Sequence, residues 1–463
     1  MTVPRTLARS EHPISRGYID PDALRVLYRL HRSGYKAYLV GGSVRDLMTG
    51  RTPKDFDVGT DARPQEIRRL FRNSRVIGRR FRLAHILFEA GKVVEVSTFR
   101  KRPEPEDAEQ KREGDEDLLI RSDNVFGSPE EDALRRDFTI NGLFYDIATY
   151  AVLDYVGGVD DLEKRVIRTI GDPWIRFRED PVRMMRACEF AGRLDFAMTP
   201  DVVEAIEELR GELRKSAAPR VLEELLDPLR RGWGARTFRL WSQNGIVDVL
   251  LPELEREVGR GAQDGHTKAL FWKMLEAADA RRLAGEELEE ATLLGVLFLP
   301  LIFAAIRRGT EKGRGFEPSR ILLVLEEVVN PIALRLSLPN LTLHLLKQSL
   351  YTMGRLAETR PGDPASRRVV GRPYFPSALA LLSLYAETSE RYGEVVSAWQ
   401  DVLARAGGRA RHGQELHSAV PFPEALVPLP PGAHADLQMP DHAARRPGRR
   451  RRRGPREKSV NRA

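Results

Sequence analysis

Two aspartates, Asp55 and Asp57, are separated by a single residue in the segment PKDFDV. In an extended strand the side chains at positions i and i+2 point to the same face, so we expect both carboxylates to project together. Two carboxylates aimed at one point repel each other unless a cation lies between them. Mg²⁺ prefers such oxygen ligands, usually with substrate phosphates as further ligands. The pair therefore predicts a magnesium site, although acidic pairs that bind nothing are also common.

Two glycines and a serine, Gly41, Gly42 and Ser43, precede the aspartates in the sequence. They lie where an apolar strand expected over 36–40 ends and a helix expected over 43–48 begins. Glycines at such a turn let backbone N–H groups approach a phosphate, and the start of a helix favours an anion. Alone this is an ordinary tight turn. Beside a magnesium site it matches what nucleotidyl transfer needs, where a hydroxyl attacks and diphosphate leaves.

The string LVGGSVRDLMTGRTPKDFDV, which contains both features, resembles the head signature of the DNA polymerase β-like nucleotidyltransferases. Within them it is similar to the class II group of tRNA CCA-adding enzymes and bacterial poly(A) polymerases. Further matching stretches follow in the expected order: VVEVSTFR (93–100), EEDALRRDFTINGLFYD (130–146), DYVGGVDDLEKRVIRTIG (154–171) and REDPVRMMRACEF (178–190). The resemblance covers about residues 36–190, and a weaker likeness runs through 218–232.

The resemblance implies a role for each matching residue. Asp55 and Asp57 correspond to the metal-binding carboxylates, and Asp137 corresponds to a further catalytic acid. Nucleotide contacts are implied for Gly41, Gly42, Ser43, Arg45, Arg136, Asn141, Asp180, Arg183 and Arg186. For Arg45 the implied role is to stabilise, through its charge, either the bound nucleotide phosphates or the glycine turn itself. Arg135 and Arg136 have the alternative of being plain surface charges on a helix.

Asp180 and Arg183 form a second informative pair, in the family's EDxxR-like motif. At positions i and i+3 of a helix they share a face, where an acceptor and a donor side by side can read the Watson–Crick edge of a base. A capping ion pair is the structural alternative. Arg186, one turn further on, is expected to contact phosphate or to form a local ion pair. Glu95 is either a third carboxylate near the metal or an ion-pair partner of Arg100.

Positive charge is concentrated at the C-terminal end of the sequence. Residues 445–463 hold ten Lys and Arg against one Glu, whereas the whole chain carries a formal charge of +8, so the remainder is close to neutral. Such a block repels itself and favours a disordered arm that binds polyanions. We therefore expect RNA binding by Arg449, Arg450, Arg451, Arg452 and Arg453. A solubility or processing tail is the alternative.

The expected fold is α+β, with a small mixed sheet and helices on one side of it in the head, followed by helical neck and body and a disordered tail. The corresponding ranges are 20–175, 176–260, 261–404 and 405–463. Within the head, strands are expected over 56–58, 83–88 and 93–98, a helix after Pro64 and helical spacing over 132–147. The acidic segment 101–123 is expected to be a mobile loop.

The sequence shows neither an apolar run of membrane-spanning length nor a secretory leader, and Cys188 is its one cysteine, so we expect a cytoplasmic protein. Three features favour a poly(A) polymerase over a CCA-adding enzyme: the segments IGRRFRLAHILF (77–88) and DNVFGSPEEDALRRDFTIN (123–141), which resemble the poly(A) type, and the arginine-rich tail. The predicted reaction adds AMP from ATP to RNA 3′ ends with Mg²⁺, in RNA processing and decay, and decay proteins are possible partners. Alternatives are a CCA-adding enzyme or a non-catalytic RNA-binding adaptor, and a small-molecule nucleotidyltransferase is less favoured.

Overall fold

A computed structural model describes residues 4–78, 83–101, 125–311, 321–359, 361 and 368–405. Two expectations lie outside these residues. They are the acidic loop, of which only Lys101 is described, and the basic tail with Arg449–Arg453.

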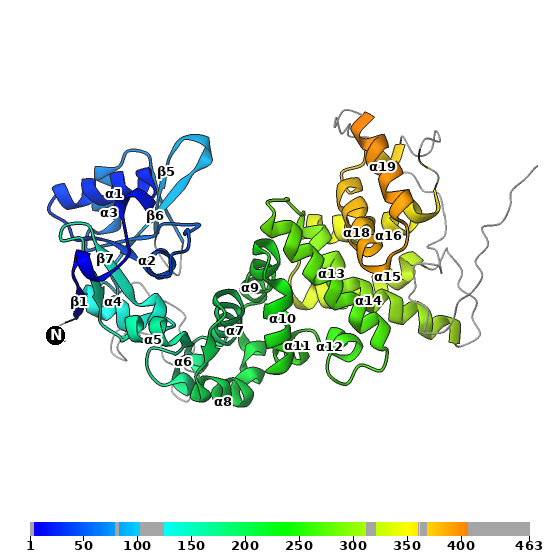
Figure 1. The fold of residues 1–463 in the computed structure, drawn as a ribbon, viewed down its shortest axis with the longest axis horizontal. Helices are drawn as coiled ribbons and strands as arrows, with labels where there is room; N and C mark the ends of the chain where they lie inside the picture. The colour runs from blue at the N-terminus through cyan, green and yellow to red at the C-terminus, as the bar shows by residue number, and fades with distance from the viewer. Residues whose placement is uncertain are drawn as a thin grey trace, which may run out of the picture. The chain divides into compact units, whose positions relative to one another are not determined.

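A mixed sheet occupies the N-terminal part of the described chain (Figure 1). Its strands, in the spatial order β1-β8-β7-β2-β3-β6-β5-β4, are β1 Arg5–Leu7, β2 Ala37–Val40, β3 Val58–Thr60, β4 Ser74–Ile77, β5 Leu83–Leu87, β6 Val93–Thr98, β7 Leu143–Asp146 and β8 Val152–Asp154. Strands β3 and β6 run parallel, and the other neighbours are antiparallel. The predicted strand 36–40 and the hairpin of 83–88 and 93–98 are confirmed.

Strand β2 lies at the centre of this sheet and all four of its residues are buried. Ala37 and Leu39 belong to the main core, whereas Tyr38 and Val40 pack in a second cluster with Ala133 of helix α4, Pro129–Arg135. Since alternate residues of a strand face opposite ways, the main core and the smaller cluster lie on opposite faces of the sheet. The predicted mixed sheet with helices packed against it is confirmed.

The helices of the head are α1 Pro21–Arg32, α2 Gly42–Met48, α3 Pro64–Leu70, α4 and α5 Gly158–Lys164. Two of them begin at a side-chain cap. The Asp20 side chain accepts hydrogen bonds from the backbone of Asp22 and Ala23 at the start of α1, and Ser128 does so for Glu131 in α4. The predicted helices after Gly42 and after Pro64 are confirmed.

The expected helix over 132–147 was wrong, because three elements share this stretch. Helix α4 ends at Arg135, a 3₁₀ turn follows at Thr139–Asn141, and strand β7 begins at Leu143. Phe138 is extended and pairs with Thr169, which holds the chain away from a helical path. Of the apolar residues at helical spacing, Phe138 and Leu143 are buried from different elements, whereas Leu134 is 46% exposed.

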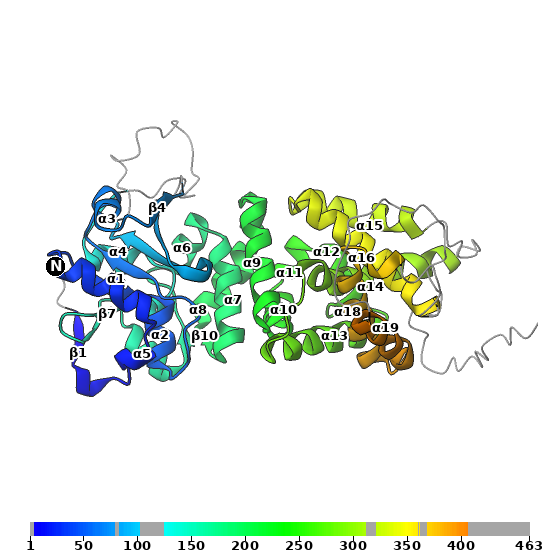
Figure 2. The same ribbon diagram turned by 90° about the horizontal axis from the view of Figure 1, so that it is seen from above.

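The remainder of the described chain is helical except for the short parallel pair β9 Val166–Ile167 and β10 Ala197–Met198 (Figures 1 and 2). Its helices are α6 Pro173–Glu179, α7 Val182–Leu194, α8 Pro200–Leu209, α9 Ala218–Arg231, α10 Gly234–Gln243, α11 Ile246–Leu250, α12 Pro252–Val258, α13 Gly265–Leu283, α14 Glu290–Glu311, α15 Ile321–Arg335, α16 Asn340–Glu358, α18 Phe375–Ser389 and α19 Gly393–Arg405. The predicted helical character of 176–260 and of the body is confirmed.

Helix α14 is long and apolar enough over Glu290–Gly309 to pass a length and composition test for a membrane span. Of that apolar window, 83% is buried inside the protein. Its position is therefore that of a core helix in the helical body.

Candidate active site

Asp55 and Asp57 lie in the loop before β3, because the strand begins only at Val58. The expectation that they sit within a strand was therefore wrong. The loop still follows the sheet, since the carbonyl of Asp57 accepts a hydrogen bond of 3.0 Å from the Val40 amide. This bond brings the aspartates to the end of β2, and both line one cavity together with Gly41, Gly42 and Ser43.

The negative charge around Asp57 is only partly neutralised by the protein. Burial raises the pKa of Asp57, the charge of Glu95 on β6 raises it further, Arg136 lowers it and Asp55 raises it, so that it reaches about 6. Within the described chain no group of three or more His, Cys, Asp and Glu residues is arranged to hold a metal. Two carboxylates that repel each other beside an open cavity do fit a hard cation that takes its other ligands from substrate phosphates.

Glu95 itself lies with its carboxylate 3.1 Å from Nε2 of His85, its cross-strand partner on β5. It lines a cavity with Asp57, and its charge acts on the Asp57 carboxyl. The structure thus places Glu95 near Asp57 and in contact with His85, and its role beside a metal stays a prediction.

The glycine turn depends on a backbone shape that other residues avoid. Gly41 has φ of +66°, and a Cβ there would lie 2.7 Å from Nη1 of Arg136. The Ser43 hydroxyl donates to the Val40 carbonyl at 3.1 Å, so this side chain holds the turn. The first N–H groups of helix α2 have no partner within the helix, and Gly41, Gly42 and Ser43 line the cavity of the aspartates.

Replacing Gly41 with alanine is expected to damage this site for two reasons. The new methyl group must displace the Arg136 guanidinium, and the alanine backbone must adopt a positive φ. We expect transfer activity per folded molecule to fall by at least about tenfold, since small misplacements of reacting groups are costly. Gly50→Ala is the matched control: its φ is +71°, but nothing lies within 4 Å of the added Cβ. Both variants should lose about 1 kcal/mol of stability. Equal activity in the two variants would contradict the steric argument.

Asp137 is held by three donors. Its carboxylate accepts hydrogen bonds from Arg186 at 2.9 Å, from the Asn141 amide at 3.0 Å and from the Phe138 backbone at 2.8 Å. Burial alone would raise the pKa of Asp137, but the Arg186 charge and these hydrogen bonds outweigh it and lower the pKa to about 2. Asp137 is therefore an ionised acceptor of fixed orientation and not a proton donor near neutral pH.

Arg45 is buried, with 2% of its surface exposed, and it lies in helix α2 directly after the glycine turn. It donates to Oδ1 of Asn141 at 2.6 Å and to Oδ1 of Asp46 at 2.9 Å. The other Asp46 oxygen accepts from Arg193 of α7 at 2.8 Å. With Asp137 and Arg186 these side chains form one continuous chain of contacts, which we call the head–neck relay: Arg193, Asp46, Arg45, Asn141, Asp137 and Arg186. Of the two expectations for Arg45, these contacts match steadying of the turn.

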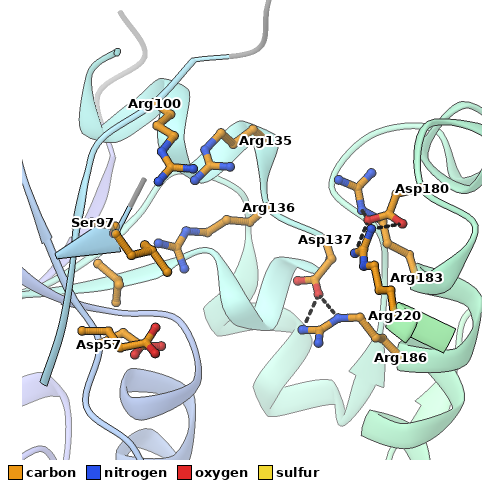
Figure 3. Close-up of a pocket in the computed structure, with 13 residues that line it drawn as sticks. Asp57, Ser97, Arg100, Arg135, Arg136, Asp137, Asp180, Arg183, Arg186 and Arg220 are labelled. Atoms are coloured by element: carbon orange, nitrogen blue, oxygen red, sulfur yellow. Dashed lines mark hydrogen bonds and ion pairs between the residues drawn. The ribbon is translucent and has the colours of Figure 1, made fainter. Parts of the chain in front are cut away.

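Asp180 and Arg183 do not share a helix, contrary to expectation. Asp180 ends α6 and Pro181 precedes α7, which begins at Val182. Their side chains are 3.9 Å apart, from Arg183 Nε to Asp180 Oδ2. Asp180 instead accepts hydrogen bonds from both terminal nitrogens of Arg220, at 2.8 and 2.6 Å (Figure 3). Arg183 donates to the Arg176 carbonyl at 3.1 Å. The pair still meets at one place, but Arg220 of α9 orients the aspartate.

Two cavities meet at these residues. The first, of about 360 Å³, is lined on the head side by Glu95, Ser97, Arg100, Arg135 and Arg136, and on the neck side by Asp180, Arg183 and Arg220. The second, of about 350 Å³, contains the glycine turn, Lys54 and Asp55. Asp57, Arg136, Asp137 and Arg186 line both. All the predicted site residues of the described chain therefore border one continuous region.

Several residues of this region were missed from the sequence: Asp46, Lys54, Asp132, Arg193 and Arg220. Asp46 and Lys54 stand next to predicted residues, so proximity in sequence was a usable indication for these two. Arg193 and Arg220 reach the site only through tertiary contacts with Asp46 and Asp180. Asp132 lies in α4 and contacts Arg135 and Arg136, but it directly follows Glu130 and Glu131 in the sequence, so nothing local sets it apart from them.

Comparison with known proteins agrees with this geometry. Residues 37–168 match the family described as "Poly A polymerase head domain", and residues 195–257 match "Probable RNA and SrmB- binding site of polymerase A". The chain is 39% identical to Poly(A) polymerase I of Escherichia coli O157:H7 over 392 residues, 84% of this chain and 83% of that one. It is 35% identical to the CCA-adding enzyme of Bacillus pumilus over 51% of this chain and 56% of that one.

A solved structure of the Bacillus stearothermophilus CCA-adding enzyme in complex with CTP has the same fold, with a TM-score of 0.56 and 26% identity, covering 84% of this chain and 83% of that one. Fold and site together define an RNA nucleotidyltransferase with a polymerase β-like head. Within that class, the chain belongs to the bacterial poly(A) polymerase family. The family and the enzyme class predicted from the motifs are confirmed.

Proposed function

We propose that this protein is a template-independent polyadenylate polymerase. It transfers AMP from ATP to the 3′-hydroxyl of RNA: the hydroxyl oxygen bonds to the α-phosphorus, the bond to the β-phosphate oxygen breaks, diphosphate leaves, and the hydroxyl proton passes to solvent. The observation that carries the proposal is the position of Asp57, where the cavity of the glycine turn meets the arginine-lined cavity. A nucleotide and an RNA end can therefore converge on one carboxylate.

In this proposal Asp55 and Asp57 hold Mg²⁺, which when bound withdraws charge from the phosphates and favours the alkoxide of the RNA end. The N–H groups at the start of α2 and the exposed Lys54 orient the triphosphate. Arg136 adds positive charge between the two cavities. Asp137 stays ionised and accepts a hydrogen bond from a sugar hydroxyl, so its part is positioning rather than proton donation. Positioning and electrostatics supply most of the catalysis.

Base recognition is assigned to Asp180 and Arg183. A carboxylate offers about four acceptor sites, of which Arg220 takes two, so Asp180 can still accept a hydrogen bond from an exocyclic amino group. Arg183 can donate to a ring nitrogen beside it. An acceptor and a donor at this spacing fit the Watson–Crick edge of adenine, with Arg220 acting as the residue that fixes the acceptor.

The remaining expectations belong to this proposal. The partners are RNA 3′ ends and ATP, with RNA-decay proteins as further candidates, and the compartment is the cytoplasm. The division into head, neck, body and tail follows the ranges given above. Arg449–Arg453, outside the described residues, are assigned a nonspecific hold on the RNA backbone that should weaken as salt rises.

The function is tested by giving the purified protein each nucleoside triphosphate separately, with either a generic RNA or a tRNA that lacks its 3′-terminal CCA. We expect long A tails on the generic RNA with ATP alone. The similarity to CCA-adding enzymes makes them the competing assignment. Incorporation of both C and A on the tRNA, with a stop after CCA, would replace the proposal with that one.

The raised pKa of Asp57 predicts how the metal requirement changes with pH. The protonated carboxyl cannot hold a cation, and its pKa of about 6 means that the proton competes below that value. The half-saturating Mg²⁺ concentration should therefore rise by about tenfold at one unit below the pKa, and stay nearly flat above pH 7. Thermal unfolding at each pH verifies that the fold persists. A requirement that does not change between pH 5 and 7.5 would contradict metal binding by this carboxyl.

A further inference from the structure

Three arginines form the head-side wall of the first cavity, which we call the arginine wall: Arg100, Arg135 and Arg136. They come from two elements, since Arg100 follows strand β6 and the other two end helix α4. Figure 3 shows the three side chains close together, across the cavity from Asp180 and Arg220. The proposed function gives no task to Arg100 or Arg135.

A single carboxylate, that of Asp132, organises this wall. Asp132 is 1% exposed and accepts hydrogen bonds from Arg135 Nε at 3.0 Å, from Arg136 Nε and Nη2 at 3.1 and 3.0 Å, and from the Arg100 backbone at 3.1 Å. Burial opposes its charge, but Arg136 and Arg135 outweigh burial and lower the pKa of Asp132. One buried carboxylate thus fixes the side chains of Arg135 and Arg136 and the backbone of Arg100 along the same wall.

The geometry of phosphoryl transfer decides which anion the wall faces. The attacking and leaving oxygens lie roughly in line on opposite sides of the phosphorus. If the leaving diphosphate lies at the glycine turn in the second cavity, the attacking hydroxyl must approach Asp57 from the first cavity. On the neck side of that cavity lie Asp180 and Arg183, to which the proposed function assigns recognition of adenine. The head side, formed by the arginine wall, is therefore where the RNA end would bind.

We propose that the arginine wall binds the last internucleotide phosphate of the RNA, and that Arg135 is its principal contact. This inference rests on the proposed function and adds to it the binding site of the RNA, the second substrate. Arginine suits the task because its planar guanidinium donates two parallel hydrogen bonds to a phosphate. Nε of Arg135 donates a hydrogen bond to the buried Asp132 carboxylate, and this bond fixes the orientation of the guanidinium.

The test compares two RNAs and three proteins by fluorescence anisotropy without nucleotide. One RNA is a short oligoadenylate, and the other carries a neutral methylphosphonate at its last linkage. Wild type should bind the neutral RNA about tenfold more weakly, as expected for one lost charge-assisted contact. Arg135→Ala should bind both RNAs equally, and as weakly as wild type binds the neutral one. The matched control Arg178→Ala removes a 45%-exposed arginine that lines neither cavity, and it should behave as wild type.

Two further measurements separate recognition from a structural effect. The KM for RNA should rise about tenfold in Arg135→Ala while the KM for ATP stays unchanged, and Arg135→Lys should recover part of the loss. The dependence of log affinity on log salt should become shallower by about 0.7, the value for one phosphate contact on a single strand. Melting temperatures close to wild type verify folding.

The proposal is overturned if Arg135→Ala still discriminates between the two RNAs as wild type does, or if its KM for ATP rises while that for RNA does not. The second outcome would assign Arg135 to the nucleotide. Because binding is measured without nucleotide, the result does not depend on which nucleotide the protein adds. Failure of the proposed function would instead appear in wild type, as a different nucleotide preference.

Discussion

Replacing Asp57 with asparagine is expected to lower the rate of AMP addition by about 10³-fold or more. The amide keeps the size of the side chain but removes the charge that would hold the cation between nucleotide and RNA end. Since Asp57 lines both cavities, its loss affects the one point where both substrates meet. The measurement is single-turnover incorporation of AMP with RNA and protein in excess, so that substrate binding and transfer are separated.

The folded state should not suffer from this change, because a carboxyl whose pKa lies near 6 already resists ionisation there. Asp160→Asn is the control, since Asp160 is a half-exposed ion-pair partner of Arg5 that lines neither cavity. It should retain full activity. If Asp57→Asn also retained activity in vitro, the metal assignment would be wrong. An unchanged cellular effect with lost activity in vitro would support the adaptor alternative.

Truncating Arg220 to alanine is expected to weaken selection of adenine rather than to stop transfer. Asp180 would lose both hydrogen bonds that orient its half of the base-reading pair. Losing hydrogen bonds to a charged group costs about 1.5–3 kcal/mol, so we expect kcat/KM for ATP to fall about 10- to 100-fold. The ratio of kcat/KM for ATP to that for GTP should fall as well, because guanine presents an acceptor where adenine presents its amino group. Competition between labelled ATP and GTP on one RNA measures this ratio.

Arg220→Lys keeps the charge but cannot engage both oxygens at once, so it should recover binding more than selectivity. Arg236→Ala, on neighbouring helix α10, removes an exposed arginine paired with Asp195 and should change neither quantity. Equal losses for ATP and GTP in Arg220→Ala would show that the arginine supports the site generally and does not orient the base-reading pair.

Local patterns in the sequence predicted much of this site. The adjacent Gly41 and Gly42, and the two aspartates one residue apart, could be identified as site residues from their spacing alone. Strand β2 ends at the glycines because Gly41 has a positive φ. The strand boundary at Val58 was missed, since pairing with β6 begins there while the loop before it bonds to β2 only through Asp57. The two aspartates nevertheless line one cavity. The hydrogen bond between the Val40 amide and the Asp57 carbonyl brings them there, and not the alternation of side chains along a strand.

Partners that come from far along the chain could not be predicted. Arg220 lies 40 positions from Asp180, and Arg193 lies 147 positions from Asp46, so no helical or strand period links them. The raised pKa of Asp57 likewise depends on burial by tertiary packing and then on Glu95 of strand β6. The motif at Glu179–Arg183 indicated the correct residues but the wrong local structure, because Pro181 separates two helices there. Family likeness identified the side chains, and tertiary contacts decide what each one touches.

The head–neck relay has a consequence for how the protein meets its nucleotide. Each of its six side chains already has a partner, and Arg45 and Asn141 within it are buried. Their rotamers are therefore set when the chain folds, and the entropy of freezing them is not subtracted from nucleotide affinity. A site prepared in this way can accept successive nucleotides without rebuilding itself between additions, which suits a reaction that repeats the same step on the same strand.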